Sequence, residues 1–466
     1  MKVYIETYGC QMNQYDSGVL SFLVKERGWE LAEEWNEAEA ILVNTCSVRA
    51  HAENRVLSRL GVWGKHKREK NPSLLLGVIG CMAQKEGKTL LDRFPFLDLV
   101  VGTHRLWDIP ALLEKARKER ILAIEPTYQN FPLPKVAAGG VSAFVSIMRG
   151  CNNFCSYCIV PYVRGRERSR PPEEILEEVK ILLERGVKEV TLLGQNVNSY
   201  RGVSLKKGTV YDLPDLLKEL NGVEGLYRIK FATSHPKDLS DKLIRTVKDC
   251  QKVCEYLHVP VQSGSNRILA LMKRGYTREN YLNLVKNIRK EIPEASITTD
   301  IIVGFPTEEE EDFLGTKELM EEVRFDTAYI FKYSPRPHTA AAKLPDDVPR
   351  EEKEKRLGEL LALQKKISQE RGAELVGKVM EVLIEKREKD KWLGKTRTHR
   401  TVLVKSGENL AGKILQVKIC GNTKGILEGS WGRAQDFSRF QMLHARSDNP
   451  AHSPGAGGQA PGMPGS

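Results

Sequence analysis

The sequence predicts an α/β protein with three consecutive domains: an open parallel sheet, a partial barrel of six strand–helix units, and a small all-β barrel. Two patterns predict this. Apolar, strand-like runs alternate with helical runs as far as residue 333, which favours parallel sheets with helices on their faces. After residue 371, short strands separated by glycine turns take over, as is typical of a small β-barrel. The length of 466 residues suits two or three domains.

The first predicted domain comprises residues 1–118. We expect strands at 2–7, 40–45, 74–80 and 98–102, and helices at 13–27, 51–67 and 83–93. Cys10 comes three residues after the first strand, and Cys46 and Cys81 directly follow the next two. In an open parallel sheet the carboxyl ends of all strands lie at one edge, where ligands bind, so the three thiols should meet there. They can hold an iron–sulfur cluster with one iron left open. Three buried structural cysteines are the alternative.

The second predicted domain comprises residues 137–369 and has six strand–helix units. We expect strands at 143–148, 189–193, 228–232, 256–261, 296–303 and 327–333, and helices at 173–185, 213–220, 238–254, 278–291 and 308–323. Six parallel units in series suit an incomplete, partly open barrel. Barrels of this type carry their sites at the C-terminal ends of the strands.

A loop with three closely spaced cysteines follows the first strand of this barrel. Cys151, Cys155 and Cys158 form a C-x3-C-x2-C run, which resembles the signature of radical S-adenosylmethionine (SAM) enzymes. A cluster normally has four thiolate ligands, and the missing fourth leaves one iron open for a small molecule. A zinc loop or a chance grouping is the alternative. Zinc sites usually add a second pair of Cys or His, and no second pair follows here.

Polar side chains at the other strand ends are candidates for binding SAM. Each could equally cap a loop, and His235, which precedes Pro236, is interpreted as a loop histidine. The candidates are Gln195, Ser234, Gln262 and Asp300, together with Tyr157, which could stack on the adenine of SAM.

The third predicted domain comprises residues 370–440 and follows a charged helix at 348–371. Strands are expected at 379–386, 401–405 and 414–419. Residues 371–440 hold 15 Lys plus Arg against 8 Asp plus Glu, and the basic side chains alternate with aromatic ones. Such a surface can bind RNA, although a merely soluble basic surface is the alternative. The candidate RNA-binding residues are Lys391, Lys395, Arg397 and Arg400. The stretch 445–466, rich in Pro, Gly, Ser and Ala, is expected to be a disordered tail.

Composition narrows the functional class. With 41% hydrophobic and 29% charged residues, no run of 18 apolar residues and no signal peptide, the chain is expected to be cytoplasmic and not bound to a membrane. Nine cysteines in that compartment indicate metal or redox chemistry. A net charge of +11 suits a polyanionic partner such as RNA. Cys250 and Cys254, expected four apart on a helix, and Cys420 are interpreted as packing residues.

Local motifs along almost the whole chain, from residue 2 to about 440, resemble the methylthiotransferase family of radical SAM enzymes. That family combines an N-terminal cluster domain, a radical SAM barrel and a C-terminal RNA-binding TRAM domain. One departure is His338, where the family often has glycine. The motifs are YGCQMN at 8–13, NTCSVR at 44–49, GCMAQ at 80–84, RGC at 149–151, RGRERSR at 164–170 and GFPT at 304–307.

The resemblance implies a function. The residues around Cys10 and Cys81 look like the branch that modifies dimethylallyl-adenosine at position 37, beside the tRNA anticodon. It implies a [4Fe–4S] cluster on Cys151, Cys155 and Cys158 that binds SAM, an auxiliary [4Fe–4S] cluster on the other three cysteines, SAM as radical source and methyl donor, an anticodon stem-loop as partner, and an electron donor such as a flavodoxin or ferredoxin. Other branches act on threonylcarbamoyladenosine in tRNA or on an aspartate of a ribosomal protein. A non-catalytic zinc-dependent RNA-binding protein is the remaining alternative.

Overall fold

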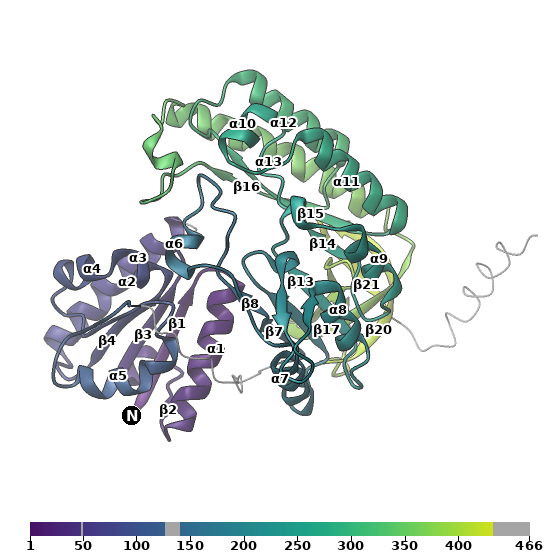
Figure 1. Cartoon of the computed structure of the whole chain (residues 1–466). Helices are drawn as coiled ribbons and strands as arrows, with labels where there is room; N and C mark the ends of the chain where they lie inside the picture. Colours follow the sequence, from purple (N-terminus) through teal and green to yellow (C-terminus); the bar gives the residue numbers. More distant parts are fainter. Residues whose placement is uncertain (48–49, 126–139, 432–466) are drawn as a thin grey trace, which may run out of the picture.

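The structure is a computed structural model that describes residues 1–47, 50–125 and 140–431. The predicted tail at 445–466 lies outside these residues. Figure 1 shows the N-terminal sheet with its helices on one side of the molecule and the barrel with the C-terminal β-domain on the other. Among the described residues, no helix is long and apolar enough to cross a membrane.

The N-terminal domain is the predicted parallel sheet. All six strands run parallel in the order β2-β1-β3-β4-β5-β6. Alternate side chains of β3 and β4 pack on α1 and α5 on one face and on α2 and α4 on the other, so both faces are buried. The strands are β1 Lys2–Tyr8, β2 Glu30–Leu31, β3 Ala40–Thr45, β4 Leu75–Gly80, β5 Leu99–Val101 and β6 Ile121–Ala123. The helices are α1 Gln11–Glu26, α2 Ala50–Glu69, α3 Cys81–Glu86, α4 Lys88–Arg93 and α5 Ile109–Ala116.

The central domain has the six expected parallel strands in two three-stranded ladders, β7-β10-β13 and β14-β15-β16. They are β7 Ser142–Ser146, β10 Glu189–Leu193, β13 Arg228–Ala232, β14 Tyr256–His258, β15 Ser296–Val303 and β16 Thr327–Lys332. The helices are α6 Val160–Arg164, α7 Pro172–Glu184, α8 Leu213–Asn221, α9 Asp241–Asp249, α10 Asn266–Leu271, α11 Arg278–Glu291, α12 Glu310–Val323 and α13 Arg350–Ala373. Two short ladders were not foreseen: β8 Met148–Arg149 with β9 Arg168–Ser169, and β11 Arg201–Val203 with β12 Val210–Asp212. The partial barrel is confirmed.

The predicted small all-β barrel at the C-terminus is confirmed, and it is a closed barrel of five strands in the order β17-β18-β19-β21-β20. Its strands are β17 Val379–Glu388, β18 Lys391–Thr396, β19 Thr401–Lys405, β20 Ile414–Thr423 and β21 Ile426–Ser430. An apolar core of valines, leucines and isoleucines with Trp392 fills it.

Local details of the prediction need correction. The helix expected at 83–93 is broken at Gly87 into α3 and α4. The helix expected at 238–254 is shorter, because Ser240 caps its start and it ends at Asp249, so Cys250 and Cys254 are buried but not on one helical face. Cys420 was expected to pack and is instead exposed. The register shifts beside it between Ile419 and Gly421, and Ile419 takes the inward position.

Candidate functional site

The three N-terminal cysteines meet at one edge of the first sheet. Cys10 caps the start of α1 after β1, Cys46 directly follows β3, and Cys81 begins α3 after β4, and these three strands are neighbours. Cys10 and Cys46 are hydrogen-bonded through their side chains. That bond lowers the pKa of Cys10 to about 6 against the opposing effect of burial, and the nearby Arg164 cation adds to the lowering. Burial raises the pKa of Cys81.

Buried amides hold this edge in shape. Asn13 Nδ2 donates to Asn44 Oδ1 at 2.9 Å, and Asn44 Nδ2 donates to Ser17 Oγ at 2.9 Å. Asn13 Oδ1 in turn lies 3.2 Å from Cys10 Sγ. Both asparagines are fully buried, so each amide needs these partners. The network ties the Cys10 turn to the end of β3, next to Cys46.

The second cysteine group lies in the loop between β8 and α6, at the C-terminal end of the barrel. The Gln195 amide oxygen accepts a hydrogen bond from the Gly150 backbone N–H at 2.5 Å and anchors the loop at its start. Burial raises the pKa of Cys151 to about 11 and that of Cys158 to about 12. Metal ligation requires the thiolates, so binding here must release protons.

Across the domain boundary, one cysteine of the first group contacts the segment that follows the second group. Cys81 packs on Ile159, the residue after Cys158, and on Val163, five residues after Cys158. At the end of α6, Arg164 Nε donates to Cys81 Sγ at 3.4 Å. Figure 1 shows α6 beside α3 between the two domains.

Another set of charges reinforces this boundary. Asp16 of α1 is buried and forms ion pairs with Arg149 Nη2 at 3.0 Å and with Arg164 Nη2 at 2.8 Å. Both arginines belong to the barrel domain, so a single carboxylate joins the N-terminal domain to the segments on either side of the cysteine loop.

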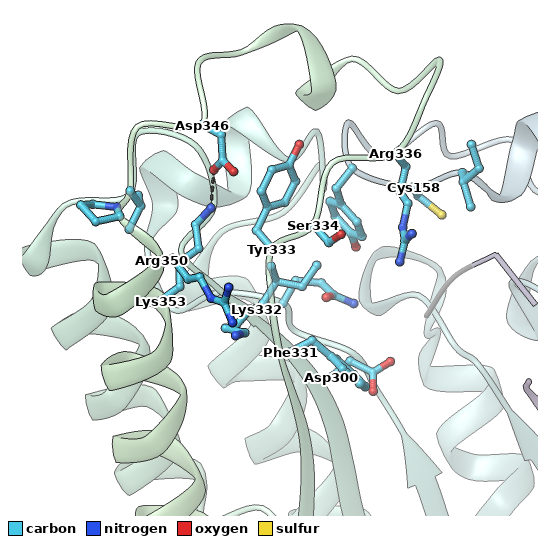
Figure 2. A pocket seen from close by; sticks show the side chains of 16 residues that line it. Cys158, Asp300, Phe331, Lys332, Tyr333, Ser334, Arg336, Asp346, Arg350 and Lys353 are labelled. Carbon is cyan, nitrogen blue, oxygen red and sulfur yellow. Dashed lines mark hydrogen bonds and ion pairs between the residues drawn. The ribbon is translucent and has the colours of Figure 1, made fainter. Parts of the chain in front are cut away.

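A pocket of about 860 Å³ opens beside the cysteine loop, over the ends of β15 and β16. Tyr157, Gln262 and Asp300 line it together with Cys158, so three of the five candidate SAM-binding residues lie around one cavity. In Figure 2, Cys158 and Arg336 lie on one side of the pocket, and Arg350 and the Lys353–Asp346 ion pair lie on the other. Ile302, Phe331, Val348 and Pro349 add apolar walls.

The other two candidates do not line this pocket. Gln195 supports the cysteine loop through its bond to Gly150. Ser234 is buried, and its Oγ has no hydrogen-bond partner within the described residues. The neighbouring His235 accepts from the Lys237 backbone N–H through Nδ1 at 3.3 Å, which fits a loop histidine, but its buried Nε2 also has no such partner. Burial lowers the pKa of His235 to about 2, so the ring is neutral.

A buried arginine near the second cysteine group was not foreseen. Arg274 Nη1 donates to Cys155 Sγ at 3.4 Å and lies 3.5 Å from Tyr157 Oη. Arg274 stands in no motif, and a buried arginine looks like any surface arginine in a sequence. Arg164, by contrast, lies six residues after Cys158 and begins the RGRERSR motif, so its proximity to the cysteines could have been suspected.

The basic residues of the C-terminal barrel lie in two places, at the surface and at the contact with the central barrel. Lys391 is partly exposed and forms a surface ion pair with Glu428 at 3.2 Å. Arg397 binds Glu255 at 2.6 Å, and Arg400 binds Asp326. Both carboxylates precede strands of the central barrel, so these arginines attach the C-terminal domain to the end of the barrel opposite the cysteine loop. RNA contact by the four candidates stays a prediction.

Within residues 1–47, 50–125 and 140–431, no three His, Cys, Asp or Glu side chains come close enough to hold a single metal ion. In a [4Fe–4S] cube each thiolate binds a different iron, so cube ligands stand farther apart than the ligands of one zinc ion. The donor sets fit cubes, because each consists of three thiols at the mouth of a cavity or at a sheet edge, and in each set one sulfur accepts a hydrogen bond from a guanidinium.

Comparisons with known proteins agree with this architecture. Family models match in three places: Uncharacterized protein family UPF0004 at residues 2–102, the Radical SAM superfamily at 145–320 and the TRAM domain at 373–431. The tRNA-2-methylthio-N(6)-dimethylallyladenosine synthase of Thermoanaerobacter pseudethanolicus is 48% identical over 435 residues, which cover 91% of this chain and 92% of that protein. The protein of the same name from Carboxydothermus hydrogenoformans is also 48% identical, over 91% of this chain and 98% of its own length.

Solved structures show the same fold at low sequence identity. The radical S-adenosylmethionine methyltransferase TsrM from Kitasatospora setae, solved with cobalamin and a [4Fe-4S] cluster bound, has a TM-score of 0.52 at 14% identity. The match covers 73% of this chain and 77% of that chain.

Proposed function

The chain belongs to the radical SAM methylthiotransferases, and on that premise we propose that it converts N6-(dimethylallyl)adenosine at position 37 of tRNA, next to the anticodon, to its 2-methylthio derivative. The observation that carries the proposal is the meeting of Cys81 with the segment after Cys158, which brings two thiol triads to one boundary. The near-complete coverage of relatives that carry this activity in their name supports the choice of substrate.

The reaction needs cofactor chemistry, because carbon 2 of adenine carries an unactivated C–H bond that no acid or base side chain can break. When bound, a [4Fe–4S] cluster with SAM supplies the radical that removes this hydrogen, and a second SAM supplies the methyl group. Cys151, Cys155 and Cys158 would hold that cluster. Tyr157, Gln262 and Asp300 would orient SAM, since they line the pocket that Cys158 adjoins.

We further propose that Cys10, Cys46 and Cys81 hold a second [4Fe–4S] cluster, the source of the inserted sulfur. Three thiols at adjoining strand ends, of which the Cys10 thiol has a lowered pKa, support this assignment. An external one-electron donor of the flavodoxin or ferredoxin class would reduce the first cluster. We also propose a cytoplasmic location, which a tRNA substrate supports.

The RNA would approach the pocket at a group of aromatic rings beside the cysteine loop, of which Tyr162 and His338 are exposed and Phe154 is half-buried. Phe154 and Tyr162 pack edge to face with centroids 5.9 Å apart, and the exposed His338 lies 6.4 Å from Tyr162. Arg166 covers the Phe154 ring at 4.3 Å. Unpaired bases stack on such rings, and a neighbouring cation favours the RNA backbone. Tyr162 is 44% exposed, which leaves room for a base.

The test is a single turnover assay. Anaerobically reconstituted full-length protein is incubated with SAM, dithionite and tRNA carrying dimethylallyl-adenosine, and the digested nucleosides are analysed by mass spectrometry. We expect the 2-methylthio nucleoside, with none formed on tRNA that lacks the dimethylallyl group. Parallel reactions contain tRNA with threonylcarbamoyladenosine, or ribosomal proteins. A methylthio product in either of these alone would refute the proposed substrate.

Iron analysis distinguishes the proposed enzyme from a non-catalytic, zinc-dependent RNA-binding protein. Two cubes predict about eight irons per chain and a brown protein. A colourless protein that carries zinc and binds RNA would contradict the proposed function.

A further inference from the structure

A buried guanidinium touches one ligand sulfur of each cysteine triad. Arg164 Nε donates to Cys81 Sγ at 3.4 Å, and Arg274 Nη1 donates to Cys155 Sγ at 3.4 Å. The side chains are 4% and 5% exposed. Neither arginine comes from the segment that carries its cysteine, because the two contacts span 83 and 119 residues of the chain.

Both arginines remain charged at these positions, because a guanidinium does not lose its proton in proteins. A fixed cation in a dry environment acts strongly on nearby charge, since little water screens it.

The two arginines differ in how the protein uses their donors. Arg274 is fully engaged, since Nη2 donates to the Pro260 carbonyl at 2.7 Å and Nε donates to Tyr276 Oη at 3.0 Å. Arg164 Nη2 lies 2.8 Å from Asp16 Oδ2 in a buried ion pair, and Nη1 is buried without a hydrogen bond to any described residue. A buried donor at Nη1 beside the N-terminal thiols fits an acceptor that the protein alone does not provide.

We propose that Arg164 and Arg274 are dedicated to different clusters, and that each sets the reduction potential of its own cluster through a charge-assisted hydrogen bond to a ligand sulfur. This inference rests on the proposed function, because it requires both clusters. Net charge, hydrogen bonds to sulfur and solvent exposure set the potential of an iron–sulfur cluster. Reduction adds a negative charge, so a neighbouring cation stabilises the reduced form and raises the potential. Loss of that cation should lower it.

The experiment isolates one cluster at a time in the full-length chain. One background carries Cys151→Ala, Cys155→Ala and Cys158→Ala and retains the N-terminal triad. The other carries Cys10→Ala, Cys46→Ala and Cys81→Ala and retains the loop triad. Arg164→Gln and Arg274→Gln are introduced separately into each background. The readouts are iron content and the midpoint potential from a redox titration followed by electron paramagnetic resonance, with no catalytic turnover required.

We expect each arginine substitution to change the potential in only one of the two backgrounds. Arg164→Gln should lower the potential only in the background with the N-terminal triad, and Arg274→Gln only in the background with the loop triad. In each case the ratio of reduced to oxidised cluster should change at least tenfold, which is about 59 mV for one electron. Arg164→Lys, which keeps the charge, should restore most of the potential. Unchanged potentials, or equal shifts in both backgrounds, would overturn the inference.

Two further outcomes are informative. If the first background holds no iron at all, the auxiliary cluster and with it the proposed function fail, which differs from an unchanged potential. If Arg164→Gln alone loses its iron, Arg164→Lys serves in its place, because it keeps the positive charge beside Cys81. A potential in that variant that falls as far as expected for Arg164→Gln would refute the role of the Arg164 charge.

Discussion

At the scale of single residues, the positions of Cys81 and Cys151 depend on the backbone conformation of the glycines that precede them. Gly80 and Gly150 have φ values of +90° and +79°, a region that side chains with a Cβ rarely adopt. A Cβ on Gly80 would lie 2.4 Å from Asn44 Oδ1, and one on Gly150 would lie 2.0 Å from the Arg166 carbonyl oxygen. The chain therefore approaches neighbouring groups closely just where each cysteine turns toward its site.

Gly150→Ala should remove the loop cluster and destabilise the fold. Gly186→Ala is the matched control, since Gly186 has a similar φ of +87° and a Cβ added there would meet nothing within 4 Å. The control should cost about 1 kcal/mol for the left-handed backbone alone. Gly150→Ala should cost roughly 2 kcal/mol more, because the backbone carbonyl must move. Urea denaturation and iron analysis measure both effects, and equal losses in the two variants would contradict this explanation.

Substitutions in the two cysteine triads should abolish different steps of the reaction. Cys151→Ala should abolish reductive cleavage of SAM, because its cluster loses a ligand. Cys46→Ala should retain SAM cleavage and lose methylthio insertion, because only the proposed sulfur source is affected. Chromatography of 5′-deoxyadenosine and mass spectrometry of tRNA nucleosides give the two readouts. SAM cleavage that survives in the Cys151 variant would refute the ligand assignment.

At the scale of elements, the C-terminal barrel attaches to the central barrel through buried charges. Arg228, the first residue of β13, binds Glu381 of β17 at 2.7 Å. Lys230 donates to His399 Nδ1 at 3.3 Å and also pairs with Glu189 at 2.7 Å. These groups gather at the N-terminal strand ends, so the seam lies across the barrel from the cysteine loop.

His399 should make this seam sensitive to acid. Burial, then Lys230 and Lys395, lower its pKa from 6.5 to about 3. The unfolded chain binds this proton below pH 6.5 and the folded chain only near pH 3, so stability is complete above pH 6.5 and falls between these values. The loss at pH 5 should be about 2 kcal/mol. In urea denaturation, His399→Gln should lose less stability between pH 7 and pH 5 than the wild type. The exposed His338→Gln should match the wild type, and no difference between the two variants would refute the prediction.

Substitutions of the basic residues in the C-terminal barrel should affect RNA binding or stability, according to where each side chain lies. Lys391→Ala should weaken binding of an anticodon stem-loop and lower the salt dependence by about one counterion, because this side chain is at the surface. Arg397→Ala should mainly destabilise the seam, since it leaves Glu255 without its partner. Fluorescence anisotropy at several salt concentrations, together with thermal melting, distinguishes the two. A larger change of salt slope for Arg397→Ala would contradict the division.

At the scale of the whole molecule, the arrangement of the two cysteine triads depends on one interface. Asp16→Asn should destabilise the protein by about 3–5 kcal/mol, because it removes one partner of two buried ion pairs, those with Arg149 and Arg164. Glu114→Gln is the control, as its ion pair with Arg27 is exposed and should be worth less than about 1 kcal/mol. Urea denaturation measures both. Similar small effects would show that the interface does not depend on this carboxylate.

Much of the fold could be predicted because its signals are local. Strands β3 and β4 are short apolar runs with both faces buried, and the helices between them have regular amphipathic spacing. Errors arose where a single residue interrupts a pattern. Gly87 divides one predicted helix, Ser240 delays the start of another, and the register shift after Ile419 turns Cys420 outward. Strands such as β2 and β6, two or three residues long, carry too little pattern to be recognised.

The sequence by itself determined the chemistry that is available: three thiols within one short loop, three more at successive strand ends, and a basic third domain. These features depend on spacing along the chain and on the single edge at which parallel strands end. Only the tertiary structure decided which partners meet. In the structure, Gln195 and Ser234 do not line the pocket, and Arg397 contacts the central barrel. Arg164 and Arg274 each contact one cysteine triad. Contacts between residues 83 to 142 positions apart arise from the packing of whole domains, which no local pattern encodes.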